Sequence, residues 1–554
     1  MKSRFYKNMV FYQIWPRSFK DGNNDGIGDL LGVLEKLDYI KSLNVDGIWF
    51  SPLYPSPQVD CGYDVSDYYT IDPIYGGMEA FKEVLNRAHE LGLKVIMDLV
   101  INHTSDKHQW FIKSREKVDP YTDYYIWRDP IVTKKGKQKA PNNWDSIFGG
   151  KAWKYDEVRK QYYLHLFTEG QPDLNMDNEL VRKEIKKIMK FWLDLGVDGF
   201  REDAITCISK DPKYPNDHLL PIFKGARFYN NGPNLQTYLQ EFYDDVLSKY
   251  DACIIAESAL ISPRKALKFV KEKDDNEIDM LIQFDCMRAD CFYSDYLPTR
   301  FHLRKLKRAF TRWQNTLNKK AWNLLYLENH DHPRSINRFA DPFYHAQSAK
   351  MLACSFLFQM GTPFIYMGQE IGMTNFKPTS LDDYIDCQTL NQAKNKSTKK
   401  RLKLYERCSR DNARTPIQWD RSDNAGFSEV TPWFHLNSNY KEINVENQER
   451  NEGSVLNFYR KAIKLRKELE VVKTGKYKEI KKLSGRIYAY TRVSKDKKLL
   501  VICSFSKWKT KFKSIKGYNL NDGKLILANY SINETFKNSF IARPFELRVY
   551  LFNQ

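Results

Sequence analysis

Eight short apolar runs recur along the chain, and a stretch with helical character follows each of them. Continuous apolar runs of this length are typical of parallel strands that are buried on both faces. After the first run, apolar residues at helical spacing predict an amphipathic helix: Leu30, Val33, Leu34, Leu37, Ile40 and Leu43. The runs themselves are Val10–Trp15, Gly47–Phe50, Lys94–Val100, Val197–Arg201, Ala252–Glu257, Met280–Asp285, Asn323–Glu328 and Pro363–Gly368.

Strands and helices that alternate in this way predict an α/β protein, and about eight repeats favour a (β/α)₈ TIM barrel. A doubly wound sheet is the alternative, because alternation alone does not close a barrel. We expect the barrel to comprise residues 1–104 and 174–480.

Two segments depart from the alternation. Residues 105–173 are aromatic and loop-like and follow the third run, so we expect an inserted subdomain above the catalytic end of the barrel. Residues 481–554 change to a period of two, which predicts a C-terminal antiparallel β-sandwich domain. Its expected strands are 486–492, 499–503, 525–528 and 545–551.

Polar side chains gather just past the ends of several predicted strands. Asp203, Glu257 and Asp331 each end a different run, and in a barrel these ends share one face, where active sites lie. Glycoside hydrolysis needs two carboxyl groups. Arg201 and Asp203 are two residues apart in a strand and face the same side, so Arg201 should keep Asp203 ionised.

These residues resemble the signature regions of glycoside hydrolase family 13, the α-amylase family. Resemblance extends across essentially the whole chain and is closest to the oligo-1,6-glucosidase and α-glucosidase group. The motifs that carry it are Asp98-x-x-x-Asn102-His103, Gly199-Phe-Arg201-x-Asp203-Ala204, Glu257, Asn329-His330-Asp331, Gln171-Pro-Asp-Leu-Asn175, Trp15-Pro-Arg-Ser-Phe19, Gly62-Tyr63-Asp64, Gly232-Pro233 and Arg410-Asp-Asn-Ala-Arg-Thr-Pro-Ile-Gln-Trp419.

The resemblance implies a role for each matching residue. Asp203 is expected to be the nucleophile, Glu257 the acid/base and Asp331 the transition-state stabiliser. The residues expected to bind the sugar are Asp60, Tyr63, His103, Phe167, Gln171, Arg201, His330 and Arg414. Asp60 and Arg414 are expected to pair and to close the pocket behind one glucose. Cys61 stands where this group usually has Asn.

The implied activity is a retaining, exo-acting α-glucosidase acting on short oligosaccharides. Ala204 follows the nucleophile, and in this family Ala at that position accompanies α-1,4 rather than α-1,6 cleavage. The alternatives are an oligo-1,6-glucosidase, a trehalose-6-phosphate hydrolase, and then a transglycosylase or sucrose isomerase. A non-catalytic relative is disfavoured because all three carboxylates are present.

A possible metal loop follows the first run. Asp21, Asn23, Asp25, Ile27 and Asp29 offer oxygen atoms at alternate positions, with Gly26 sixth, as in the first part of a calcium loop. Gly32 occupies the position where an EF-hand has a bidentate Glu, which argues against a helix-loop-helix EF-hand. The family's glucosidases have a matching calcium loop. The alternative is an Asx-rich turn without metal. We expect a structural Ca²⁺ and no organic cofactor.

The net charge is +19, but the lysines are spread along the chain without interleaved aromatics, so we expect no nucleic-acid partner. The nine cysteines contain no C-x-x-C pair, which argues against zinc and disulfides. The N-terminus lacks an apolar signal segment, and no run of about 18 apolar residues occurs. We therefore expect a soluble, cytoplasmic protein without a membrane span, most simply a monomer.

Overall fold

The computed structural model describes residues 3–219, 222–270, 278–481, 483–532 and 538–553. Its centre is a sheet of eight parallel strands in the order β11-β10-β9-β3-β2-β1-β15-β14. The strands are β1 (Phe11–Ile14), β2 (Gly47–Phe50), β3 (Lys94–Val100), β9 (Gly199–Asp203), β10 (Cys253–Ser258), β11 (Met280–Gln283), β14 (Leu324–Leu325) and β15 (Thr362–Tyr366).

The two end strands of this sheet, β11 and β14, lie next to each other, so the sheet forms a nearly closed barrel. Each of the eight predicted runs overlaps one strand, which confirms the barrel over the doubly wound sheet. Almost every strand residue is buried, because the strands face the barrel interior on one side and helices on the other.

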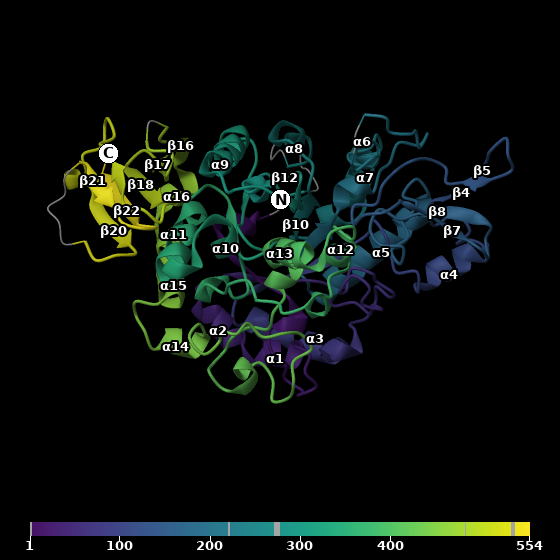
Figure 1. The fold of residues 1–554 in the computed structure, drawn as a ribbon, viewed down its shortest axis with the longest axis horizontal. Helices are drawn as coiled ribbons and strands as arrows, with labels where there is room; N and C mark the ends of the chain where they lie inside the picture. Colours follow the sequence, from purple (N-terminus) through teal and green to yellow (C-terminus); the bar gives the residue numbers. More distant parts are fainter. Residues whose placement is uncertain (1–2, 220–221, 271–277, 482, 533–537, 554) are drawn as a thin grey trace.

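Helices cover the outside of the barrel (Figure 1). The helices of the barrel and its loops are α1 (Leu30–Glu35), α2 (Leu37–Ser42), α3 (Gly77–Glu90), α5 (Glu179–Leu195), α6 (Ala226–Tyr229), α7 (Leu235–Asp245), α8 (Pro263–Val270), α9 (Leu303–Leu317), α10 (Ser335–Phe339), α11 (His345–Leu357), α12 (Cys387–Asn391), α13 (Thr398–Cys408), α14 (Val445–Glu449), α15 (Val455–Glu468) and α16 (Glu470–Thr474).

The first predicted helix is divided into α1 and α2. At Lys36 the chain makes a tighter turn, in which the Lys36 N–H donates to the Val33 carbonyl at 3.0 Å instead of to the residue one position earlier. The apolar face survives this break, since Leu30, Leu37 and Leu43 are all fully buried.

The insertion between β3 and β9 extends from one end of the molecule, on the right in Figure 1. A three-stranded antiparallel sheet in the order β4-β8-β7 and a β5-β6 hairpin lie within it. Its elements are α4 (Gln109–Arg115), β4 (Trp127–Arg128), β5 (Ile131–Val132), β6 (Gln138–Lys139), β7 (Trp153–Asp156) and β8 (Gln161–Leu164). Buried Trp144 and Trp153 belong to a separate hydrophobic cluster, which the insertion shares with Cys207, Tyr214 and Tyr229 of the segment after β9.

The C-terminal domain lies at the opposite end (Figure 1). A five-stranded antiparallel sheet, β16-β17-β18-β22-β20, shares a hydrophobic cluster with a two-stranded sheet, β19-β21. The bounds are β16 (Lys476–Glu479), β17 (Ile487–Val493), β18 (Lys497–Ser504), β19 (Thr510–Phe512), β20 (Lys524–Ala528), β21 (Phe540–Ala542) and β22 (Leu547–Asn553). The four predicted strands are present, and β16 begins before the expected start at residue 481. In the part of the chain that is described, no helix is long and apolar enough to cross a membrane.

Candidate active site

Arg201 lies at the centre of a group of buried carboxylates at the carboxyl ends of β3, β9 and β10. Its Nη1 contacts Asp98 Oδ1 at 2.6 Å and Asp203 Oδ1 at 2.7 Å, and its Nη2 contacts Glu257 Oε1 at 2.8 Å. The other Glu257 oxygen accepts the Ala204 N–H at 3.0 Å. One guanidinium therefore holds both proposed reacting carboxyl groups together, and the predicted Arg201–Asp203 contact is confirmed.

Burial sets the protonation of this pair. It raises the pKa of Asp203 to about 7, although Arg201 pulls that pKa down. It also raises the pKa of Glu257 to about 7, with Asp203 adding to the increase. Arg201 lowers the pKa of Asp203, as expected, but burial raises that pKa by more. Near neutral pH both carboxyl groups are therefore close to their pKa values, so an acid and a base are available together.

Asp331 follows β14 and has basic neighbours. His330 Nε2, Arg410 Nη1 and Arg414 Nη2 lie 3.2, 3.3 and 3.7 Å from its carboxylate oxygens. Burial alone would raise the pKa of Asp331, but these neighbours outweigh burial and hold it well below its usual range. Asp331 is thus ionised at a pH where Asp203 and Glu257 still titrate.

His330 forms part of the pocket floor. Its ring stacks on Trp15 and on Tyr63, each with 5.3 Å between ring centroids. Burial lowers its pKa well below the usual range, so the ring is neutral. The Gln13 amide nitrogen faces Nδ1 at 2.7 Å, which leaves the ring proton on Nε2, where the Tyr63 hydroxyl lies at 2.7 Å and Asp331 Oδ2 at 3.2 Å.

A second set of hydrogen bonds fixes the side wall. The Gln171 amide nitrogen lies 3.1 Å from both Asp60 Oδ2 and His103 Nε2. His103 Nε2 also lies 3.1 Å from the Tyr63 carbonyl oxygen, and its ring packs on Phe167 with centroids 4.9 Å apart. Residues from the insertion and from the loop after β2 are thereby joined in one wall.

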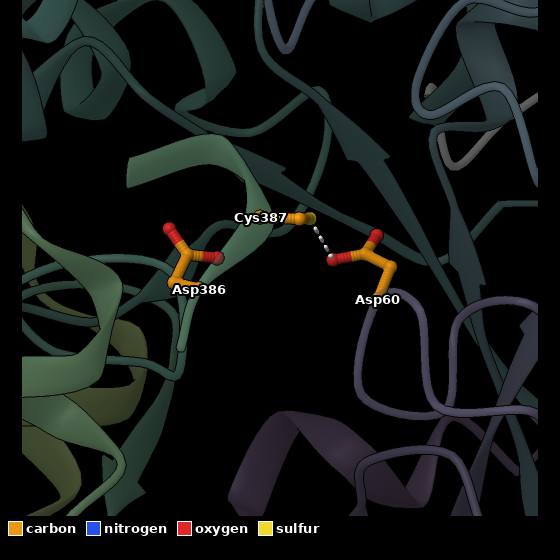
Figure 2. A group of neighbouring side chains, drawn as sticks. All are labelled: Asp60, Asp386 and Cys387. Carbon is orange, nitrogen blue, oxygen red and sulfur yellow. Dashed lines mark hydrogen bonds between the residues drawn. The ribbon is translucent and has the colours of Figure 1, made fainter. Parts of the chain in front are cut away.

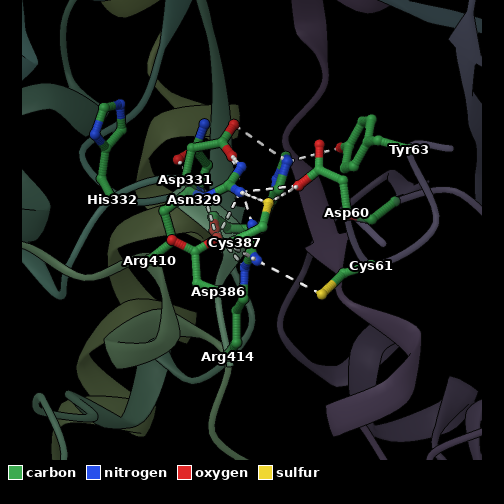
Figure 3. Close-up of polar contacts among 12 residues, drawn as sticks. Asp60, Cys61, Tyr63, Asn329, Asp331, His332, Asp386, Cys387, Arg410 and Arg414 are labelled. Carbon is green, nitrogen blue, oxygen red and sulfur yellow. Dashed lines mark hydrogen bonds and ion pairs between the residues drawn. The ribbon is translucent and has the colours of Figure 1, made fainter. Parts of the chain in front are cut away.

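The expected Asp60–Arg414 pair is wrong, because Arg410 takes that position (Figure 3). Arg410 Nη2 lies 2.9 Å from Asp60 Oδ1 and 2.5 Å from Asp386 Oδ1. Arg414 instead donates to the His330 carbonyl at 3.0 Å and packs over Trp15. The two arginines are four residues apart in one motif, and a sequence cannot show which of them faces the pocket.

Asp60, Asp386 and Cys387 lie close together (Figure 2). Within the described residues, they are the one set of three acidic, His or Cys side chains whose ligand atoms are all within 4.8 Å of one another. The Cys387 thiol donates to Asp60 Oδ1 at 3.5 Å. Arg410 already neutralises both carboxylates and would repel a metal ion, so we interpret this group as an ion-pair network.

A cavity of about 470 Å³ opens onto these groups, within the usual range for a small-molecule site. The predicted residues that line it are Asp60, Tyr63, His103, Phe167, Asp203, Glu257, His330 and Asp331, together with the unpredicted Arg410. Gln171, Arg201 and Arg414 were also expected in the pocket, but they lie behind its wall and hold the lining residues in place.

The proposed metal loop is a turn whose carboxylates bind backbone. Asp21 accepts the N–H groups of Asn24 and Gly26, both at 2.7 Å, and Asp29 accepts that of Gly32 at 2.7 Å. These are the bonds of the Asx-turn alternative. The three loop carboxylates do not converge as closely as the Asp60 group does.

The donor chemistry of the loop nevertheless suits a hard cation. Asp21 and Asp29 are fully buried, and among the described residues no Lys, Arg or His side chain forms an ion pair with either. Burial raises the pKa of Asp29, and the charge of Asp21 adds to the increase. Two buried carboxylates without a basic partner would gain from a cation with oxygen ligands. The remaining predicted ligands are Asn23, Asp25 and Ile27.

The chain is similar to known proteins over almost its whole length. A family model described as "Alpha amylase, catalytic domain" matches residues 13–475. An oligo-1,6-glucosidase of Parageobacillus thermoglucosidasius is 45% identical, with 99% of each chain covered. An alpha-glucosidase of Schizosaccharomyces pombe is 38% identical over 96% of this chain and 95% of its own. A crystal structure of a trehalose-6-phosphate hydrolase mutant from Bacillus licheniformis superimposes with a TM-score of 0.93 at 40% identity, covering 99% of both chains.

Proposed function

The chain belongs to the α-amylase family of glycoside hydrolases, and we propose that it is a retaining, exo-acting α-glucosidase. It releases glucose from the non-reducing end of short α-glucosides. One observation carries the proposal: a single guanidinium, that of Arg201, holds Asp203 and Glu257 side by side in the cavity that Asp331 also lines.

The proposed reaction has two steps. Asp203 forms a bond to the anomeric carbon while the glycosidic C–O bond breaks and Glu257 protonates the leaving oxygen. Water then attacks the glucosyl ester, Glu257 takes its proton, and Asp203 leaves as a carboxylate. Two inversions at one carbon retain the α configuration. Asp331, held ionised by basic neighbours, stabilises the positive charge that develops on the sugar ring.

Exo action is supported by the inner wall of the cavity. Asp60 and Arg410 are ion-paired there and present a carboxylate and a guanidinium to the hydroxyl groups of one terminal sugar. A longer chain has no path past this pair, so only the last glucose would reach the Asp203–Glu257 pair.

For linkage, Ala204 favours α-1,4 over α-1,6 bonds. Its N–H bonds Glu257 and its side chain lines the cavity, so bulk at this position would crowd the second sugar of a 1,4-linked substrate. A steric conflict of one or two methyl groups raises the free energy of the transition state by about 1–3 kcal/mol, which corresponds to roughly 10–200-fold discrimination in kcat/KM. The second candidate is an oligo-1,6-glucosidase, which is the name of the relative at 45% identity.

Ala204→Val should therefore shift the ratio of kcat/KM values toward isomaltose. Ala204 has φ +44°, where a β-branched residue is strained, so backbone strain must be separated from bulk. Ala204→Gly relieves the backbone without adding volume and should leave the ratio near that of the parent. A parent that already cleaves isomaltose far better than maltose contradicts the Ala204 argument and leaves the glucosidase assignment intact.

Trehalose 6-phosphate is a weaker candidate for the substrate. Its phosphate needs a cationic clamp, and Arg288 is the one Arg or Lys besides Arg410 among the described residues that line the cavity. The Arg288 guanidinium already donates to the Ala259 carbonyl at 2.6 Å. A transglycosylase or sucrose isomerase would share the covalent intermediate and differ only in the acceptor.

A structural calcium ion is also proposed for the loop of residues 21–29. Asp21, Asn23, Asp25 and Asp29 would supply side-chain oxygens, and Ile27 its carbonyl. The ion would neutralise two buried carboxylates and would take no part in the reaction.

A panel assay of glucose release tests the whole proposal. The substrates are maltose, isomaltose, sucrose, trehalose and trehalose 6-phosphate. We expect maltose and short maltooligosaccharides ahead of isomaltose, and little glucose from trehalose 6-phosphate. Release from trehalose 6-phosphate alone would replace the proposed function with its phosphate-specific alternative, and release from none would refute it.

A further inference from the structure

Two aromatic side chains stand exposed where the catalytic cavity opens. Phe292 is 58% exposed and Tyr293 is 61% exposed, yet both line the same cavity as Asp203 and Glu257. Their rings meet edge to face, with centroids 4.7 Å apart. Single exposed apolar residues are common on protein surfaces and need no explanation. Two adjacent exposed aromatic rings at the mouth of a cavity indicate a binding surface, because a ligand that enters the cavity can pack against them.

The hairpin that carries the rings is firmly anchored. It consists of β12 (Cys291–Phe292) and β13 (Ser294–Pro298), which pair antiparallel. Asp295 in β13 contacts His332 Nδ1 at 2.6 Å and Arg338 Nη2 at 2.9 Å. His332 is the neighbour of Asp331, so the hairpin is tied directly to the segment that carries a catalytic carboxylate.

A second anchor joins the hairpin to the closed end of the pocket. The Tyr296 hydroxyl lies 2.6 Å from Thr389 Oγ1 and donates to Asp386 Oδ2 at 3.3 Å. Asp386 in turn binds Arg410, which binds Asp60. One continuous network therefore fixes the exposed rings relative to the site that would hold the terminal glucose.

The tip of the hairpin is strained. Tyr293 has φ +63°, a conformation that a bulky non-glycine residue adopts at a cost. Gly or Asn would form this turn more easily. Strain that the surrounding structure maintains is a reason to look for a function of the residue.

We propose that Phe292 and Tyr293 form an outer sugar-binding subsite, which stacks against the third sugar of an oligosaccharide. The inference rests on the proposed function and names its substrate class as oligosaccharides longer than a disaccharide. Because Asp60 and Arg410 close the inner end, the rest of the substrate must leave through the mouth, past these rings. Aromatic faces suit the C–H faces of a sugar ring, and the Tyr293 hydroxyl can bond its hydroxyl groups.

The test compares trisaccharides with disaccharides. We expect the double variant Phe292→Ala/Tyr293→Gly to lower the kcat/KM ratio of maltotriose to maltose, and of isomaltotriose to isomaltose, by about tenfold, mainly through KM. Gly is chosen at 293 because it accepts the positive φ without strain. The double variant Phe292→Tyr/Tyr293→Phe keeps both rings and should keep the parent ratios.

The control is Trp508→Ala, which removes a ring of similar exposure, 63%, in the C-terminal domain and should leave the ratios unchanged. The proposal is overturned if the ring-free variant has the parent ratios or if Trp508→Ala lowers them equally.

Calorimetric titration of maltotriose and isomaltotriose into the Glu257→Gln protein, with and without the two rings, separates the outer subsite from the proposed function. Ring-dependent binding in a protein whose parent releases no glucose would keep the subsite and refute the glucosidase. Glucose release with ring-independent binding would refute the subsite alone.

Discussion

At the scale of single residues, Arg201 is shared by Asp203 and Glu257, and desolvation brings both carboxyl groups to a pKa of about 7. Activity requires Asp203 ionised and Glu257 protonated. Turnover should therefore fall as the pH rises above about 7, when Glu257 loses its proton, and fall below about 7, when Asp203 gains one. The result is a narrow bell-shaped profile centred near neutral pH.

Glu257→Gln tests the acid role. The variant should lose most turnover on maltose, because nothing protonates the leaving oxygen, but should keep more turnover on an α-glucoside with an activated phenol leaving group. Its profile on that substrate should also lack the alkaline limb. Asp331→Asn is the control, since it removes a neighbouring carboxylate that donates no proton and should impair both substrates alike. Equal loss on both substrates in Glu257→Gln would argue against an acid role.

Arg410 should support stability as well as binding, because it neutralises two buried carboxylates. Arg410→Met leaves Asp60 without its ion-pair partner and Asp386 with only Arg414, at 3.5 Å, and should lower the free energy of unfolding at pH 7 by about 3–5 kcal/mol. Adding Asp386→Asn should recover part of this loss. Urea unfolding measures both variants, and a double variant no more stable than the single one would contradict the ion-pair account.

The pH dependence of that loss follows from Asp386. Burial raises its pKa, but Arg410 and Arg414 outweigh burial and lower it to about 2. A lowered folded-state pKa contributes stability above the unfolded value, about 3.9, and the contribution disappears as the pH falls toward the folded value. The deficit of Arg410→Met should thus be smaller at pH 3, inside this window, than at pH 7.

The sequence predicts contacts between residues that are close along the chain better than contacts between distant residues. Arg201 and Asp203 share a strand face by spacing alone, and the structure confirms their contact. The partner of Asp60 lies 350 residues away, and two arginines of one motif were available. Only the folded chain shows that Arg410 points into the cavity and that Arg414 turns beneath it.

At the scale of elements, the barrel strands were predictable because burial on both faces leaves long apolar runs. The hairpin of β12 and β13 was not, since it is short and exposes two aromatic residues at its tip. Strands β19 and β21 have three residues each, too few to show a period of two. The sequence shows that the insertion is rich in aromatic residues. It does not show that Gln171 at the end of the insertion donates a hydrogen bond to Asp60, which lies in the loop after β2.

The loop of residues 21–29 yields a prediction at this scale. Asp21→Ala should lower the melting temperature and abolish any calcium-dependent stabilisation, because a ligand bound only by the folded state stabilises that state. The matched control is Ser428→Ala, which removes a hydrogen bond to Asp21 Oδ2 of 2.6 Å and no proposed ligand, so it should keep the calcium response. A parent protein that melts identically in calcium and in chelator would contradict the site.

At the scale of the whole molecule, the cavity is assembled from segments between residues 60 and 410. The barrel brings the strand ends together, the insertion supplies Phe148 and Phe167, and α12 supplies Gln388. Phe148 packs on Arg410 with 4.7 Å between the guanidinium and the ring centroid, which covers the closed end of the pocket. The family and the barrel follow from the sequence, whereas the shape of this pocket needs the three-dimensional arrangement.

The central claim is that Asp203 forms a covalent glucosyl intermediate, and the anomer first released tests it most directly. A time course of maltose or isomaltose hydrolysis, followed by proton NMR before mutarotation, should show α-glucose as the first product. Retention requires the two carboxyl groups to lie about 5–5.5 Å apart, and the guanidinium of Arg201 contacts both of them. β-Glucose as the first product would contradict the account, because it requires water rather than Asp203 to attack the sugar.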